Sequence, residues 1–307
     1  MELFINKILS FILFVLLSFI IIICFNYYLI NQFAIETKNE PILLLGDSNM
    51  QCAINDSIFN SSVNKAASAD SYFYSFLKLH KIAHDDQDID TVLLSFAPHN
   101  LFDNGWLINN KILNLNLPLY YPLMEWSDFK FLLLKNPNAV LASFPDIIKR
   151  SCNNLIYLVR SKPPSYYGGF IGLNRYMLNI VQLKLKNGEP LPFFKIPENF
   201  EVSPGEKKYL DKIIELCEQK SIKLILINTP KRFEILEYPK YGLDEFYKFY
   251  DANYQNVDFI DLGKFCLPDD NYGDFVHLNI KGSTTFSRTR KNNHRDCPCG
   301  CLHITQL

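Results

Sequence analysis

Four short runs of apolar residues recur along the chain, and each is closed by a turn signal. They span Pro41 to Gly46, Thr91 to Phe96, Lys223 to Asn228 and Val257 to Leu262. Near-continuous Leu, Ile and Val segments are typical of strands that are covered on both faces, as in a parallel sheet. We therefore expect four buried strands, two in each half of the chain.

Segments with helical spacing lie between these strands. Ser71 to His84 has apolar residues at the spacing of a helix, and Ser203-Pro204 begins another helix with a capping Ser and a Pro at its first position. Strands that alternate with helices predict an α/β fold with a doubly wound, mostly parallel sheet. Ligands of such sheets bind outside the carboxyl ends of the strands.

The N-terminus has a different pattern. No charged residue occurs between Lys7 and Glu36, and Ile8 to Ile30 is almost wholly apolar. At about 1.5 Å per residue this run is long enough to cross a hydrocarbon core of about 30 Å. It predicts one transmembrane helix, with residues 1–40 as anchor and linker. Lys7 and Lys38 flank the span almost symmetrically, so charge leaves its orientation open.

The remaining sequence divides into residues 41–287, the α/β domain, and a tail. Residues 103–201 are less regular and rich in Pro, Asn, Tyr and Phe, so we interpret them as an insertion with helices near 128–134 and 140–160. This insertion either covers the active edge, as a lid or acceptor-binding surface, or elaborates the fold without contacting a ligand. The sequence leaves both alternatives open.

The tail, residues 288–307, is basic and contains the cysteines of Cys297-Pro298-Cys299-Gly300-Cys301. Zinc sites usually separate paired ligands by two to four residues and add a second pair further away, and the spacing here is too tight for that. We expect a disordered terminus, or a tail that is not native to the domain, and predict no metal site.

Composition excludes some functions. Lys and Arg number 31 against 32 Asp and Glu, for a net charge of −1, so no basic excess attracts nucleic acid. The chain has no phosphate-binding or dinucleotide-binding glycine motif, and we predict no cofactor. The 17 Tyr and 25 Phe fit ordinary packing, and a subset of them fits a surface on which sugars stack.

Candidate chemistry lies at the two ends of the α/β pattern. The first apolar strand stops at Gly46-Asp47-Ser48, and Asp274 precedes His277 by three residues near the C-terminus. A serine hydroxyl needs a neutral imidazole within hydrogen-bond reach to accept its proton, and a carboxylate to fix the tautomer of that imidazole. We therefore predict Ser48 as nucleophile, His277 as base and Asp274 as the group that orients it.

At these residues the sequence resembles the SGNH/GDSL hydrolase superfamily. Leu45-Gly46-Asp47-Ser48 matches the first block of that family and Asp274-Phe275-Val276-His277 matches the last. The resemblance implies a flavodoxin-like three-layer sandwich. It also implies that the backbone N–H of Ser48 is one oxyanion donor.

The middle blocks imply the other oxyanion donors. Asn100 ends a segment where the family has Gly-x-Asn-Asp, so its side chain is the implied donor. Residues 63–68 stand where the family has a glycine block but contain no glycine, and a backbone N–H of Ala67 or Ser68 is the implied substitute.

The likeness extends to the membrane-anchored branches associated with acylation of cell-surface polysaccharide. It implies an esterase or O-acyltransferase whose main domain lies outside the cytoplasm, on the periplasmic or extracellular side. A polysaccharide or acyl ester would be the substrate, and a multi-span acyl-donor protein would be a partner. The missing glycine and the altered context of Asn100 leave an alternative, a catalytically inactive glycan-binding or assembly subunit of an exopolysaccharide system.

Overall fold

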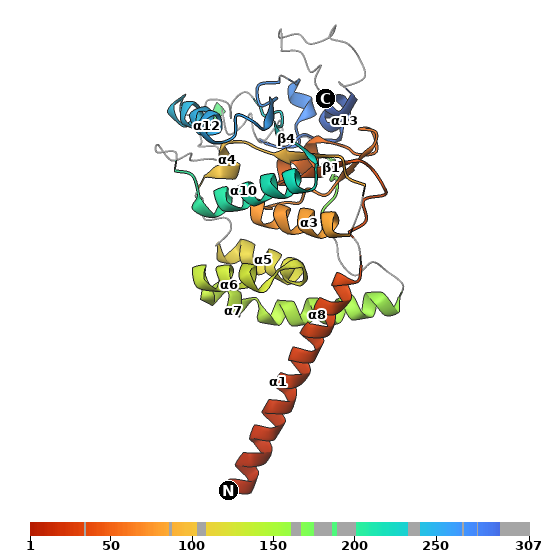
Figure 1. Cartoon of the computed structure of the whole chain (residues 1–307), viewed down its shortest axis with the longest axis vertical. Helices are drawn as coiled ribbons and strands as arrows, with labels where there is room; N and C mark the ends of the chain where they lie inside the picture. The colour runs from red at the N-terminus through yellow and green to blue at the C-terminus, as the bar shows by residue number, and fades with distance from the viewer. Residues whose placement is uncertain are drawn as a thin grey trace. The chain divides into compact units, whose positions relative to one another are not determined.

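The structure is a computed structural model. It describes residues 1–33, 35–85, 88–102, 109–160, 167–174, 186–188, 201–232, 240–265, 267–274 and 276–288. The chain forms two compact units: unit 1 comprises Met1–Ile35 and Gly105–Tyr167, and unit 2 comprises Glu36–Asn104 and Gly168–Leu307 (Figure 1). The predicted Cys-rich tail lies outside the described residues, except for Arg288.

Unit 2 contains a parallel sheet of five described strands in the order β2-β1-β3-β4-β5. These strands are β1 (Ile42–Leu45), β2 (Ser62–Asn64), β3 (Thr91–Ser95), β4 (Lys223–Asn228) and β5 (Asp258–Asp261). The parallel α/β sheet expected from the apolar runs is confirmed. The sequence did not predict β2, because this strand has only three residues and a single apolar one, Val63.

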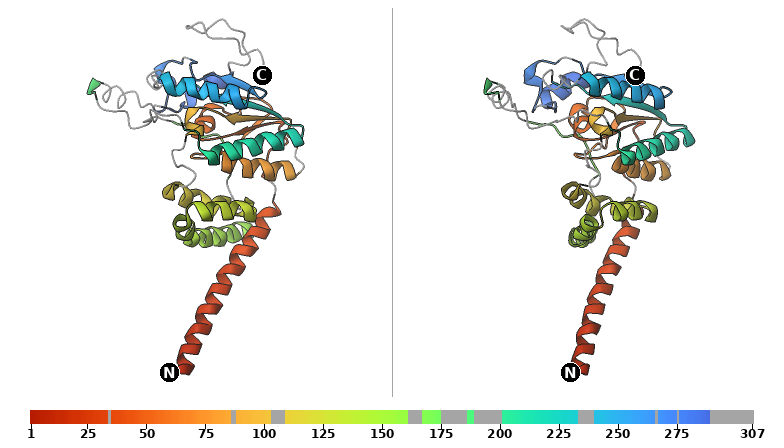
Figure 2. Two further views of the ribbon diagram at one scale, coloured as in Figure 1. Left: turned by 60° about the vertical axis from the view of Figure 1, so that its left-hand side comes forward. Right: turned by 90° about the vertical axis from the view of Figure 1, so that its left-hand side faces the viewer.

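Helices lie on both sides of this sheet in unit 2 (Figures 1 and 2). The helix α3 (Tyr72–His84) packs beside α10 (Pro204–Gln219) on one side, where the rings of Phe73 and Tyr209 meet with centroids 4.7 Å apart. The helix α12 (Lys240–Asn253) lies on the other side, where Phe246 contacts Phe96 with centroids 5.0 Å apart. The apolar faces of the helices thereby bury both faces of the sheet.

Short helices follow the strands at the carboxyl edge of the sheet. They are α2 (Ser48–Ala53) after β1 and α4 (Pro98–Leu101) after β3, while η3 (Asp269–Asn271) and α13 (Ile280–Arg288) come after β5. The strand order changes direction between β1 and β3, since β2 lies outside β1 and β4 outside β3. Such a point is where open parallel sheets form a ligand-binding crevice.

The regular elements described in unit 1 are all helices. This unit holds α1 (Glu2–Asn31), α5 (Asn110–Tyr120), η2 (Tyr121–Leu123), α6 (Trp126–Lys135), α7 (Pro137–Ala142) and α8 (Phe144–Val159). The segment Leu3–Asn31 is long and apolar enough to cross a membrane, with a mean hydropathy of 3.2 over its most apolar window.

The insertion predicted at residues 103–201 is thus divided. Residues 109–160 belong to unit 1, together with α1. The helix predicted near 128–134 is α6, and the one predicted at 140–160 consists of the two helices α7 and α8. The helix α5 was not predicted, because the Pro and Asn residues in its sequence are typical of irregular structure.

Candidate active site

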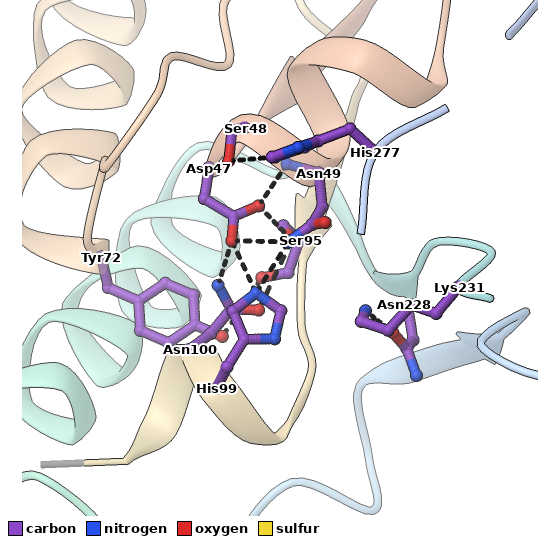
Figure 3. Close-up of polar contacts among 10 residues, drawn as sticks. All are labelled: Asp47, Ser48, Asn49, Tyr72, Ser95, His99, Asn100, Asn228, Lys231 and His277. Atoms are coloured by element: carbon purple, nitrogen blue, oxygen red, sulfur yellow. Dashed lines mark hydrogen bonds and ion pairs between the residues drawn. The ribbon is translucent and has the colours of Figure 1, made fainter. Parts of the chain in front are cut away.

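The structure brings Ser48, His277 and Asp274 together in unit 2. The Nε2 atom of His277 lies 2.8 Å from the Oγ atom of Ser48, and the two side chains face each other (Figure 3). On the other side of the ring, Nδ1 lies 2.9 and 2.8 Å from the two carboxylate oxygens of Asp274. These contacts have the distances that activation of a serine nucleophile requires.

Ser48 is positioned by a tight turn between β1 and α2. Gly46 has a φ of +134°, and a Cβ atom there would lie 2.3 Å from the Cβ of Ser95 on the adjacent strand, so only glycine fits. Asp47 is the N-cap of α2 and accepts a hydrogen bond from the backbone N–H of Asn49 at 3.1 Å. As the first residue of α2, Ser48 has a backbone N–H without an acceptor inside the helix.

Asp274 and His277 are held by the loop before α13. The Oδ1 atom of Asp274 accepts the backbone N–H groups of Val276 and His277 at 3.0 and 2.9 Å. The loop is closed by a hydrogen bond from the N–H of Gly273 to the carbonyl of His277 at 2.9 Å. Because backbone groups fix the carboxylate, the imidazole is oriented before any substrate arrives.

The charge state of Asp274 suits this role. Partial burial by itself raises the pKa of Asp274, but the hydrogen bond and charge of His277, with the two backbone N–H groups, lower that pKa to about 2. The carboxylate is therefore ionised at neutral pH. An ionised Asp274 holds the proton of His277 on Nδ1 and leaves Nε2 free to accept a proton from Ser48.

Asp47 is the centre of a buried polar cluster beneath Ser48. Its carboxylate lies 2.6 Å from Nε2 of His99, accepts from the side-chain amide of Asn100 at 3.1 Å and accepts from Oγ of Ser95 at 3.3 Å (Figure 3). Burial by itself raises the pKa of Asp47, but the charge and hydrogen bond of His99, together with Lys231 and Asn49, lower it below its ordinary value. Asp47 thus joins the end of β1 to α4.

Three of the four residues predicted as oxyanion donors form hydrogen bonds within the protein. The amide of Asn100 donates to Asp47, and the N–H of Ala67 donates to the carbonyl of Gly46 at 3.0 Å. The hydroxyl of Ser68 donates to the side chain of Gln51 at 2.8 Å. The N–H of Ser48 lies beside the nucleophile itself, and the oxyanion role of all four residues remains a prediction.

Part of the predicted insertion borders this site. The N–H of Gly169 donates to the carbonyl of Ala66 at 3.0 Å, and the N–H of Ile171 donates to the carbonyl of Gln51 at 3.2 Å. Gln51 in turn donates from its side chain to the carbonyl of Gly169 at 3.1 Å. Residues 168–174 therefore belong to the edge of the sheet where Ser48 lies.

Two buried groups at the site were missed by sequence reasoning, His99 and Lys231. Lys231 follows β4, and its Nζ donates to Oδ1 of Asn228 at 2.8 Å (Figure 3). Burial lowers the pKa of Lys231 to about 8, although the charges of Asp47 and Asp261 oppose this shift. The sequence did contain a signal for both residues. His99 and Lys231 each follow an apolar strand, and residues in that position lie at the edge of the sheet where the site forms.

Comparison with known proteins gives no function for this chain. One protein-family model, whose description gives no function, matches residues 195–296. This match includes β4, β5 and the segment with Asp274 and His277, but not Ser48. A search of curated proteins found no match to the chain.

Proposed function

We propose that the protein is a membrane-anchored serine esterase or O-acyltransferase of the SGNH/GDSL type that acts on cell-surface polysaccharide. The observation that carries the proposal is the chain of contacts from Ser48 through His277 to Asp274, each at 2.8 Å. Three side chains from distant parts of the sequence meet in the order that proton transfer requires.

The reaction would proceed in two steps. Ser48 Oγ attacks the acyl carbonyl, His277 takes the hydroxyl proton, and the N–H of Ser48 donates to the oxyanion. His277 then returns the proton to the departing alcohol, which leaves an acyl group on Ser48. In the second step water or a sugar hydroxyl gives its proton to His277 and attacks the acyl group, which frees Ser48. Water makes the protein an esterase, and a sugar makes it a transferase.

Several features support this proposal. The strand order is that of flavodoxin-like doubly wound sheets, and helices on both sides suit the three-layer sandwich of the SGNH fold. Ser48 and Asn100 both follow strands that flank the point where the strand order changes direction. The membrane placement, with unit 2 outside the cytoplasm and a multi-span acyl donor nearby, comes from α1 and from the family resemblance.

Ester hydrolysis by the full-length protein in detergent tests the proposal. The wild type should release p-nitrophenol from short-chain p-nitrophenyl esters, and Ser48→Ala should lower kcat to background, a loss on the order of 10⁴-fold or more. Ser57→Ala, an exposed change in the same unit, is the matched control. Equal rates in wild type and Ser48→Ala would refute Ser48 as nucleophile. Transfer of acetate to an oligosaccharide, rather than to water, would identify the transferase.

A second candidate function is a catalytically inactive glycan-binding or assembly subunit. The observation that favours it is that the amides of Asn100 and Ala67, two implied oxyanion donors, are taken by Asp47 and by Gly46. A fluorophosphonate probe separates the two candidates. Covalent labelling at Ser48 supports the enzyme, whereas an unlabelled protein that binds glycan supports the inactive subunit.

A further inference from the structure

The helix α8 of unit 1 has polar side chains on its buried face. Ser151 and Asn154 are buried, and the amide of Asn154 donates to Oδ1 of Asn26 on α1 at 2.9 Å. Asn26 donates in turn to the hydroxyl of Tyr121 at 2.6 Å, and that hydroxyl lies 2.7 Å from Oγ of Ser151. These hydrogen bonds join α1, η2 and α8 through a polar interior.

The same helix has an apolar stripe on its surface. The stripe recurs every three or four residues, so its members share one face of the helix. It consists of Phe144, Ile148, Cys152, Leu155 and Val159, none of which is fully buried. Val159 is 88% exposed, and Leu141 and Ile156 beside the stripe are 60% and 48% exposed.

A surface helix in water normally buries its apolar stripe. Here the stripe lies outside the buried face, which consists of Ile147, Ser151 and Asn154. Each Å² of apolar surface left in water forgoes about 25 cal/mol. A lipid environment removes that loss, because acyl chains cover apolar side chains and the buried hydrogen bonds satisfy the polar ones. The exposed apolar stripe of α8 therefore points to lipid as the medium on its outer face.

The position of α8 along α1 agrees with this. The N-terminal part of α1 extends away from the other helices of unit 1 (Figures 1 and 2). The contacts that join α8 and η2 to α1 lie at its C-terminal end, at Asn26 and Asn31. About 20 residues before them are exposed and apolar, enough for about 30 Å of hydrocarbon. If these residues span the bilayer, α8 lies at its interface.

Charge on α8 fits a membrane surface. Lys149 and Arg160 are exposed, and both lie outside the apolar stripe, together with the exposed Asp146. Basic side chains beside an apolar stripe favour an interfacial position on anionic lipid. Trp126 on α6 is 71% exposed and stacks on Phe129, and exposed tryptophans are enriched at headgroup depth.

We propose that α8 is an interfacial membrane helix whose apolar stripe, Phe144 to Val159, contacts the acyl chains of an anionic phospholipid bilayer. The surface of α8 would continue the lipid-facing surface of α1, to which α8 is fixed by the hydrogen bonds of Asn26. The proposal requires α1 to span the membrane but does not depend on the chemistry of Ser48.

Photocrosslinking in vesicles tests the proposal. The full-length protein, with p-benzoylphenylalanine in place of Val159, is reconstituted in vesicles of phosphatidylcholine and phosphatidylglycerol and irradiated. We expect phospholipid adducts at position 159, detected by mass spectrometry, at several times the yield at position 149, where Lys149 is replaced in the same way. Position 14, an exposed Phe of α1, is the control for the membrane span.

Each outcome decides the question. Lipid adducts at positions 14 and 159 but few at 149 support the interfacial helix. Adducts at 14 alone overturn it while leaving α1 as an anchor, and adducts at neither position overturn both. Protein adducts at 159, in these vesicles or in native membranes, would overturn lipid as the occupant and identify a protein-docking surface. Ester hydrolysis by the same variants reports separately on the proposed function.

Discussion

The Nε2 atom of His277 lies within hydrogen-bond distance of the Oγ atom of Ser48 although 229 residues separate them. This contact requires α2, which follows β1, to meet the loop before α13. A second link supports it, since the backbone N–H of Asn55 after α2 donates to the hydroxyl of Ser287 on α13 at 3.0 Å. The nucleophile and its base are therefore placed by the packing of two short helices.

The orienting role of Asp274 is testable by Asp274→Asn. An amide in place of the carboxylate donates toward Nδ1 of His277 and so favours the wrong tautomer of the ring. We expect kcat for ester hydrolysis to fall on the order of 10⁴-fold. Thermal unfolding should change little, because the remaining side-chain oxygen still accepts the two backbone N–H groups.

Asp270→Asn is the matched control for Asp274→Asn, since Asp270 is an exposed carboxylate in the same segment and is paired with Lys281. It should leave kcat unchanged. A kcat for Asp274→Asn within a factor of ten of wild type would show that His277 does not depend on this carboxylate.

Asp47 should determine the stability of the site. Asp47→Asn keeps a side-chain oxygen to cap α2 but removes the buried negative charge that faces His99. The new amide group also faces the side-chain amides of Asn49 and Asn100, which lose an acceptor. A buried hydrogen-bonding group left without its partner costs about 1–3 kcal/mol, and we expect a loss of stability of that size. Thermal unfolding of the full-length protein in detergent measures it.

Asp258→Asn provides the comparison for Asp47→Asn, because Asp258 forms an exposed ion pair with Lys223 at 3.1 Å. Such pairs contribute about 0–1 kcal/mol. Similar unfolding temperatures for Asp47→Asn and Asp258→Asn would contradict the interpretation of Asp47 as the centre of the buried cluster.

Gly46 tests how tightly the turn before Ser48 is constrained. Gly46→Ala places a Cβ against Ser95 and imposes a positive φ on alanine, so the turn must shift. We expect a stability loss of about 2–4 kcal/mol and loss of ester hydrolysis, because Ser48 moves with the turn. Gly188→Ala is the control. Gly188 has a φ of +65°, but a Cβ atom there would meet no atom within 4 Å, so this variant introduces backbone strain without a steric clash. An active, stable Gly46→Ala would show that the turn adapts.

The sequence predicted the parallel sheet well because its strands are buried on both faces. Leu43, Leu44 and Leu45 are all inaccessible to solvent, and such strands read as continuous apolar runs. Parallel strands end at one edge of the sheet, so residues after them can be placed there without knowing any contact. That rule was sufficient to associate Ser48 with Asn100.

The burial of other residues could not be predicted because it depends on contacts between distant segments. A histidine or a lysine after a strand is usually solvated, and only the packing around His99 and Lys231 makes both of them buried. The position of α8 could not be predicted from the sequence for another reason. Its apolar stripe suggests burial in a core, whereas in the structure its buried residues Ser151 and Asn154 form hydrogen bonds with Tyr121 of η2 and Asn26 of α1.

Lys231 makes stability depend on pH in a defined window. Its pKa is about 8 in the folded protein, against an ordinary value of 10.5, because burial disfavours the charged amine. Between these two values the unfolded chain binds more protons than the folded one. The free energy of unfolding therefore rises with pH across this window, with a slope of up to about 1.4 kcal/mol per pH unit from this group.

Lys231→Met should remove that contribution, so the unfolding temperature of the variant should rise less than that of the wild type between pH 8 and pH 10. The quantity to compare is the change of unfolding temperature with pH in the two proteins. Other groups titrate equally in both, so their contributions cancel in the difference. Lys223→Met, which changes an exposed lysine at the start of β4, should retain the wild-type slope. Thermal unfolding of the three proteins in detergent at pH 8, 9 and 10 measures the effect. Identical slopes for Lys231→Met and wild type would mean that Lys231 keeps its ordinary pKa and is not desolvated beside Asp47.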